Sequence, residues 1–185
     1  VWDSALVQVS MPPQRLMDAI RGNLQEGRAS AVRVLLHGPS GTGKTAFARE
    51  LARQIDRPLL EKRPSDLLSA WVGGTEKEID QAFVDARQMD AVLLIDEVDS
   101  FLLRRDTSLR SWEVSMVNEL LMQLSDFEGV VVLTTNRMDA LDRAVLRRMD
   151  LKVAFYPLSA DQVITAVGRL TEDLGLPPPN ADQQL

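Results

Sequence analysis

The sequence predicts an α/β fold in which helices cover both faces of a five-stranded parallel sheet, giving three layers, with one more helix after the sheet. Two observations lead to this prediction. Short apolar runs alternate with longer amphipathic runs, as expected for parallel strands joined by crossover helices. The short runs are also almost continuously apolar, which is typical of strands buried on both faces. The expected strands are residues 32–37, 58–62, 92–95, 130–133 and 152–156.

Helices are expected between these strands. Pro13 suits the first turn of a helix that runs to residue 25. Ser159 and Gln162 form a capping box that opens a helix ending near Leu174. The helix at 112–124 places one apolar face toward the sheet, made by Val117, Leu120, Leu121 and Leu124. The remaining helical segments are residues 46–55, 65–69, 75–89 and 141–148.

The composition limits the class of protein. A chain of 185 residues, 45% of them hydrophobic, can bury one substantial core. The formal net charge of −6 argues against a general nucleic-acid binder, which needs a basic face. Disulfides and thiolate metal sites are excluded because the chain has no cysteine. No apolar run is long enough for a membrane span. We expect an intracellular, cytoplasmic protein of which this chain, lacking an initiator Met, is a piece.

A glycine-rich segment after the first strand carries the most specific motif. Residues 38–45 read Gly-Pro-Ser-Gly-Thr-Gly-Lys-Thr, which fits the Walker A pattern between a strand and a helix. Backbone N–H groups of such a loop wrap phosphates, Lys44 would reach the β and γ oxygens, and Thr45 would join a Mg²⁺ shell. We therefore expect a phosphate-loop NTPase whose nucleotide contacts are Gly38, Pro39, Ser40, Gly41, Thr42, Gly43, Lys44, Thr45 and Ala46. The alternative is a glycine turn that binds nothing.

Two acids follow the third strand, in the manner of a Walker B motif. Open parallel sheets place their ligands at the carboxyl ends of strands, where Asp96 and Glu97 stand. Asp96 would hold Mg²⁺, directly or through water, and Glu97 would act as the general base on the attacking water. The alternative is that both acids merely solvate the end of a strand.

These motifs together resemble the AAA family of ATPases, within the AAA+ class, over residues 2–158. The resemblance implies that residues 1–157 form the large ATPase subdomain and that 158–185 begin a truncated small helical lid. It also implies ATP and Mg²⁺ as ligands, a homo-hexamer, and a protein substrate. Leu6 and Val7 lie where the family brackets the adenine base.

Further catalytic residues are implied by the same resemblance. Asn136 ends the fourth strand, where the family keeps the sensor 1 side chain that helps to place the lytic water. Residues 141–148 resemble the second region of homology, whose arginine fingers reach a neighbour's nucleotide. These would be Arg147 and Arg148, with Arg148 preferred. Adjacent arginines here are most similar to the microtubule-severing, or meiotic, branch or to related bacterial members. The alternative is two solvated arginines at a helix end.

Trp71, Val72 and Gly73 resemble the first pore loop of the family, in which an aromatic residue grips an extended peptide in the central channel. The alternative is a Trp packed beneath its own loop. The segment 104–110 falls at the place of a second pore loop, or is solvated surface.

Three functions fit these residues. The first is an ATP-hydrolysing motor that remodels, unfolds or disassembles a protein through its pore. The second is a nucleotide-dependent switch or scaffold that assembles on ATP without moving a substrate. A nucleic-acid-acting AAA+ protein is disfavoured by the acidity of the chain.

Overall fold

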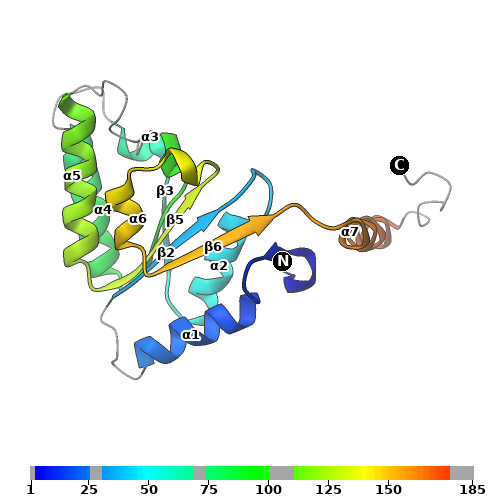
Figure 1. Cartoon of the computed structure of the whole chain (residues 1–185). Coiled ribbons are helices and arrows are strands. Elements are labelled where there is room, and N and C mark those ends of the chain that lie inside the picture. The colour runs from blue at the N-terminus through cyan, green and yellow to red at the C-terminus, as the bar shows by residue number, and fades with distance from the viewer. Residues whose placement is uncertain (1–2, 26–30, 69–73, 101–110, 176–185) are drawn as a thin grey trace.

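The computed structural model describes residues 3–25, 31–68, 74–100 and 111–175 (Figure 1). Its strands form one sheet in the order β1-β6-β2-β5-β4-β3. Their bounds are Gln8–Val9 for β1, Ala31–His37 for β2, Leu59–Lys62 for β3, Val92–Ile95 for β4, Gly129–Thr135 for β5 and Leu151–Tyr156 for β6. The five strands from β2 to β6 pair in parallel, as predicted.

The expected strand count was one too low. The short strand β1 pairs antiparallel with β6, with Gln8 opposite Tyr156 and Val9 opposite Phe155. Its two residues form no apolar run, so the sequence gives no local signal for this strand, which forms by pairing with β6, far away in the sequence. The sheet therefore has six strands within the described residues, and β1 is at its edge.

Helices cover the two faces of the sheet as the expected three layers (Figure 1). On one face lie α1 and α2, and on the other lie α3, α4, α5 and α6. Their bounds are Pro13–Gln25 for α1, Lys44–Gln54 for α2, Pro64–Leu67 for α3, Gly74–Gln88 for α4, Ser111–Asp126 for α5 and Arg143–Arg148 for α6. Short 3-10 turns, η1 at Ser4–Leu6, η2 at Val98–Ser100 and η3 at Met138–Ala140, complete the body.

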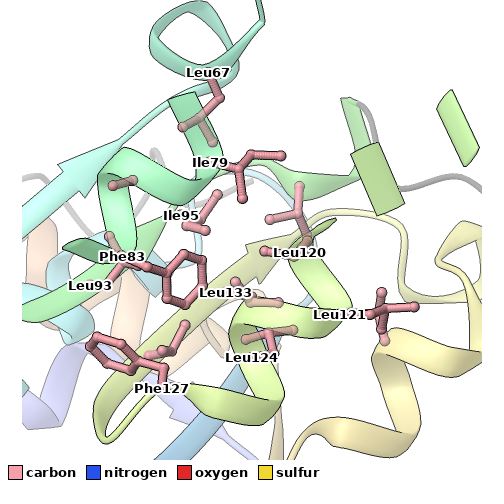
Figure 2. Close-up of a cluster of buried hydrophobic side chains, with 14 of the residues drawn as sticks. Leu67, Ile79, Phe83, Leu93, Ile95, Leu120, Leu121, Leu124, Phe127 and Leu133 are labelled. Atoms are coloured by element: carbon pink, nitrogen blue, oxygen red, sulfur yellow. The ribbon is translucent and has the colours of Figure 1, made fainter. Parts of the chain in front are cut away.

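The larger core lies between the sheet and the pair α4 and α5 (Figure 2). Phe83 and Phe127 pack edge to face there, with ring centroids 5.3 Å apart. The predicted apolar face of α5 is confirmed, since all four of its residues, Val117, Leu120, Leu121 and Leu124, are buried. On the other face Phe47 of α2 packs against Phe155 of β6 with centroids 5.8 Å apart. This contact fixes the helix that follows the glycine-rich loop.

The starts of two helices depend on side-chain caps. The helix expected at 141–148 begins only at Arg143, because the Asp142 side chain accepts from the Ala144 N–H at 2.7 Å and caps it. The capping box of the last helix, α7 (Ala160–Asp173), is confirmed, since Ser159 and Gln162 bond each other's backbone N–H groups. In the described ranges no helix is long and apolar enough to cross a membrane.

Candidate nucleotide-binding site

Polar side chains gather where β2, β4 and β5 end. They line a hollow of about 310 Å³ at the carboxyl edge of the sheet. This is the edge at which open α/β sheets bind ligands. The loop after β2, the start of α2 and the residues just after β4 and β5 supply its lining, which consists of Ser40, Gly41, Gly43, Lys44, Thr45, Ala46, Arg49, Asp96, Glu97, Thr134 and Asn136.

Two glycines shape the loop for different reasons. A Cβ at Gly38 would lie 2.0 Å from the carbonyl oxygen of Phe155, so no side chain fits between the loop and β6. Gly43 caps α2 with a φ of 94°, in the left-handed region that favours glycine. The first turn of α2 therefore directs its unpaired N–H groups and the positive end of the helix dipole toward the hollow. Such an arrangement suits phosphate.

Lys44 lies at the centre of the site and is buried. Its Nζ donates to the carbonyl oxygens of Gly38 at 2.7 Å and Pro39 at 2.8 Å, and to Asn136 Oδ1 at 2.8 Å. Burial lowers the pKa of Lys44, while the carboxylates of Asp96, Asp99 and Glu97 act in the opposite direction. The structure thus brings together two residues that are 92 positions apart in the sequence, Lys44 and Asn136.

The expected metal ligands also meet. The Thr45 hydroxyl donates to Asp96 Oδ2 at 3.0 Å, and both side chains are half-buried. A hydroxyl beside a carboxylate is an all-oxygen donor pair, which suits Mg²⁺. Among the described residues no group of three His, Asp or Glu side chains could hold a metal alone. A Mg²⁺ ion here would complete its shell with phosphate oxygens and water, so the residues fit the expected ion.

Glu97 is exposed at the rim of the hollow, two residues after the end of the buried strand β4. Its φ of 53° lies in the left-handed region, which non-glycine residues seldom adopt. The extended backbone that continues from β4 ends at Glu97, and the next residues form η2. The Glu97 carboxylate therefore lies where a water molecule can reach it.

Sequence reasoning missed two residues of this site. Thr134 of β5 is only 1% exposed, and its hydroxyl contacts both Asp96 and the backbone N–H of Glu97. Asp99 Oδ1 accepts from the backbone N–H of Asn136 at 3.1 Å. The available signal for Thr134 was a polar residue placed directly after the apolar run of residues 130–133. Nothing local marked Asp99.

The expected arginine fingers lie at the opposite edge of the sheet. They end α6, and Asp150 just beyond donates its backbone N–H to the Arg33 carbonyl near the start of β2. Arg148 Nε donates to Ser125 Oγ at 3.0 Å, at the end of α5. Arg147 is exposed, and in the described part of the chain no hydrogen bond or ion pair holds its side chain.

Leu6 and Val7 lie just before β1. Because Gln8 pairs with Tyr156 at the end of β6, these residues continue past the carboxyl edge of the sheet, on the side of the phosphate hollow. Val7 packs against the core below, and Gln162 of α7 donates to its carbonyl oxygen at 3.3 Å. Trp71, Val72 and Gly73 lie outside the described residues, as does the segment 104–110.

A larger hollow of about 490 Å³ lies beside His37, between the end of β2 and α6. Burial, followed by the charge of Lys44, lowers the pKa of His37. The exposed surface of its walls is mainly apolar, and the lining includes neither the glycine-rich loop nor Asp96 and Glu97. Chemistry rather than size therefore identifies the smaller hollow as the candidate site.

Comparison with known proteins agrees with this geometry. A model of the family described as "ATPase family associated with various cellular activities (AAA)" matches residues 34–157, about two thirds of the chain. The matched span contains the loop, both acids, Asn136 and both arginines.

Three similar proteins illustrate the range of relatives. The ribosome biogenesis ATPase RIX7 of Saccharomyces cerevisiae is 35% identical over 151 residues, 78% of this chain and 18% of that protein. Fidgetin-like protein 1 of Drosophila melanogaster is 39% identical over 132 residues, covering 68% of this chain and 25% of its own. The 26S proteasome regulatory subunit 8 homolog of Schizosaccharomyces pombe is 37% identical over 139 residues, 69% and 34% of the two chains. The chain thus spans about a third or less of these relatives, and similar identities to differently named proteins do not select a branch.

Proposed function

Because the chain belongs to the AAA family of ATPases, we propose that it binds ATP with Mg²⁺ in the hollow beside Lys44 and hydrolyses the terminal phosphate. The observation that carries the proposal is the meeting of the Thr45–Asp96 pair with Lys44 and Asn136 in one hollow. A cation, a metal-ligand pair and a polar sensor are the parts that phosphoryl transfer requires.

Each residue has a part in the proposed reaction. The N–H groups of the loop and of the first α2 turn hold the phosphate oxygens. Bound Mg²⁺ would neutralise charge on the β and γ oxygens, and Thr45 and Asp96 would hold it. Lys44 turns its ammonium from the Gly38 and Pro39 carbonyls to the phosphates. Glu97 accepts the proton of the attacking water, which Asn136 orients.

The arginines complete a site only in a second copy. The strand β2 rises about 3.3 Å per residue, so Arg33 and His37 are roughly 13 Å apart, and the phosphate loop begins beyond His37. The end of α6 lies near Arg33, because the backbone N–H of Asp150, just after α6, donates to the Arg33 carbonyl near the start of β2. Arg147 therefore cannot serve the nucleotide of its own chain, and it serves that of a neighbour in an oligomer, which we propose is a homo-hexamer. Arg148 is held by Ser125, so Arg147 is the better candidate for the finger.

We further propose that the oligomer is a motor acting on a protein through the loop at Trp71. The supporting observations are the Trp-Val-Gly sequence and a relative named as a proteasome regulatory subunit. A switch or scaffold that assembles on ATP would share every residue of the nucleotide site. Stimulation of hydrolysis by an unfolded protein favours the motor, and an unchanged rate favours the scaffold. An intracellular location, the branch and the lid at residues 158–185 remain predictions.

Replacement of the proposed base tests the hydrolytic function. Glu97→Gln should retain ATP binding and lose roughly 10²- to 10⁴-fold in turnover, because proton transfer to the side chain is removed. The measurements are binding of a fluorescent ATP analogue and release of phosphate. Glu128→Gln, an exposed acid between α5 and β5, is the matched control and should behave as the wild type. Undiminished turnover in Glu97→Gln would remove the assignment of the base.

A further inference from the structure

Thr134 joins the two acids of the proposed site. We propose that it is a positioning residue for hydrolysis: its single hydroxyl fixes the carboxylate of Asp96 and the backbone of Glu97 at once. This inference rests on the proposed function and adds to it a residue for which the motifs give no role.

The register of the sheet places Thr134 beside the acids. In the parallel pair β4 and β5, Ile95 lies opposite Leu133, so the next position on each strand brings Asp96 beside Thr134. The Thr134 side chain is only 1% exposed, and its neighbours along β5, Leu133 and Thr135, are also buried. A buried hydroxyl needs hydrogen-bond partners, and the two acids supply them.

Both functions of the hydroxyl are used. Its proton is donated to Asp96 Oδ1, and its oxygen accepts from the Glu97 N–H at 3.0 Å. An ionised carboxylate can only accept and a backbone N–H can only donate, so the hydroxyl must donate to Asp96 and accept from Glu97 to make both bonds. Asp96 thereby receives two hydroxyls, from Thr45 of α2 and from Thr134 of β5. The carboxylate is held from both sides, in the orientation that leaves it facing the hollow.

The second bond supports an unfavourable backbone. Glu97 has a φ of 53°, a conformation that persists in a residue with a side chain only where its surroundings hold it. The Thr134 oxygen is the acceptor for the N–H of that residue. Without this bond Glu97 can relax toward the extended conformation of the preceding strand, which redirects its carboxylate. The hydroxyl therefore aims the base as well as the metal ligand.

A reciprocal contact makes the arrangement specific to this pair of strand ends. Asp99, three residues after Asp96, accepts from the backbone N–H of Asn136, two residues after Thr134. A side chain of β5 thus holds the exit of β4, while a side chain beyond β4 holds the exit of β5. Thr135 does not take part, because its hydroxyl accepts from the Arg137 N–H instead.

The test compares Thr134→Val, Thr134→Ser and the control Thr135→Val in the complete protein. Thr134→Val keeps the shape and removes both bonds, Thr134→Ser keeps both, and Thr135→Val repeats the change at a buried neighbour. The readouts are kcat and KM for Mg–ATP, and the affinity for Mn²⁺ with a non-hydrolysable ATP analogue, measured by electron paramagnetic resonance. Thermal unfolding monitors the fold.

Thr134→Val should lower kcat by roughly tenfold to a hundredfold, the range for loss of hydrogen bonds to charged groups, with a smaller change in KM. Its Mn²⁺ affinity should fall several-fold, whereas Thr134→Ser and Thr135→Val should both stay near the wild type. If Thr134→Val does not fold, Thr134→Ala carries the same expectation without the added apolar contact. Wild-type kcat and Mn²⁺ affinity in whichever variant folds would overturn the proposal. A wild-type protein without ATPase activity would instead refute the proposed function.

Discussion

The carboxyl edge of the sheet, where the parallel strands end, and the amino edge, where they begin, use polar residues in opposite ways. At the carboxyl edge, Lys44, Asp96 and Thr134 are buried or half-buried. Lys44 donates to Asn136 there, and Thr134 and Thr45 donate to Asp96, around one hollow. At the amino edge, Arg33 and Arg148 bond the end of α5 and leave Arg147 exposed. In the proposed function, the carboxyl edge receives the nucleotide and the amino edge presents the cation of Arg147 to a neighbour.

This difference has a consequence for assembly. The two parts of the proposed catalytic machinery lie on opposite edges of one rigid sheet, so a single copy cannot bring them together. Only side-by-side copies can place the amino edge of one against the hollow of the next. The comparison therefore predicts that the residues of the two edges act on one reaction from different subunits.

The largest expected effect is at Arg147. Arg147→Ala should lower turnover by roughly a thousandfold or more, as loss of an arginine finger does, with ATP binding retained. Arg148→Ala should cost less, because Arg148 is already bonded to Ser125. Mixing Arg147→Ala with Lys44→Ala should restore part of the activity, since the second variant supplies an intact Arg147 to the intact hollow of the first. Mixed oligomers without restored phosphate release would break the comparison.

A smaller effect, on stability rather than catalysis, is expected at Arg33. Its guanidinium donates to the carbonyls of Leu124 and Ser125, and lies 3.6 Å from the Asp150 carboxylate. Arg33→Met should lower the free energy of unfolding by about 1.5 to 3 kcal/mol, because carbonyls at the end of α5 lose charged donors. Urea denaturation measures this change. ATP affinity should stay within about twofold of the wild type. A large loss of affinity with normal stability would show that the amino edge shapes the hollow directly.

The smallest expected effect is at Glu50 of α2. Hydrogen bonds from Arg53 and Gln54 lower the pKa of Glu50 from 4.5 to about 2. A lowered folded pKa means that the stabilisation is complete above the unfolded pKa near 4.5 and is lost as the pH falls toward 2. Glu50→Gln should therefore be less stable by about 0.5 kcal/mol at neutral pH. Urea midpoints should converge with those of the wild type as the pH approaches 2, and turnover should not change. A difference that grows on acidification would contradict the assignment of the lowered pKa to these two hydrogen bonds.

Most of the sheet could be predicted because its central strands are buried on both faces. Residues 92–95 were expected as a strand and form β4 with the same bounds, and the other parallel strands differ by at most two residues at either end. A continuous apolar run is a local signal that needs no knowledge of the partner. The strand β1 gives no such signal, because Gln8 and Val9 are defined by pairing with residues near 155.

The candidate site divides in the same way. The glycine-rich loop, Asp96 and Glu97 carry local patterns, and the structure places them around one hollow. Thr134, Asp99 and the hold of Ser125 on Arg148 could not be predicted, because each depends on which strand or helix lies alongside. The roles of Leu6, Val7 and Trp71 are still predictions.

Gly38 has a mechanical consequence. Its backbone lies so close to the Phe155 carbonyl that no side chain separates the phosphate loop from β6. Phe155 is one residue from the end of β6, and a three-residue link then leads into α7. We therefore expect a displacement of α7 to act through β6 on the first residue of the phosphate loop, and nucleotide binding in the loop to act on α7 along the same route.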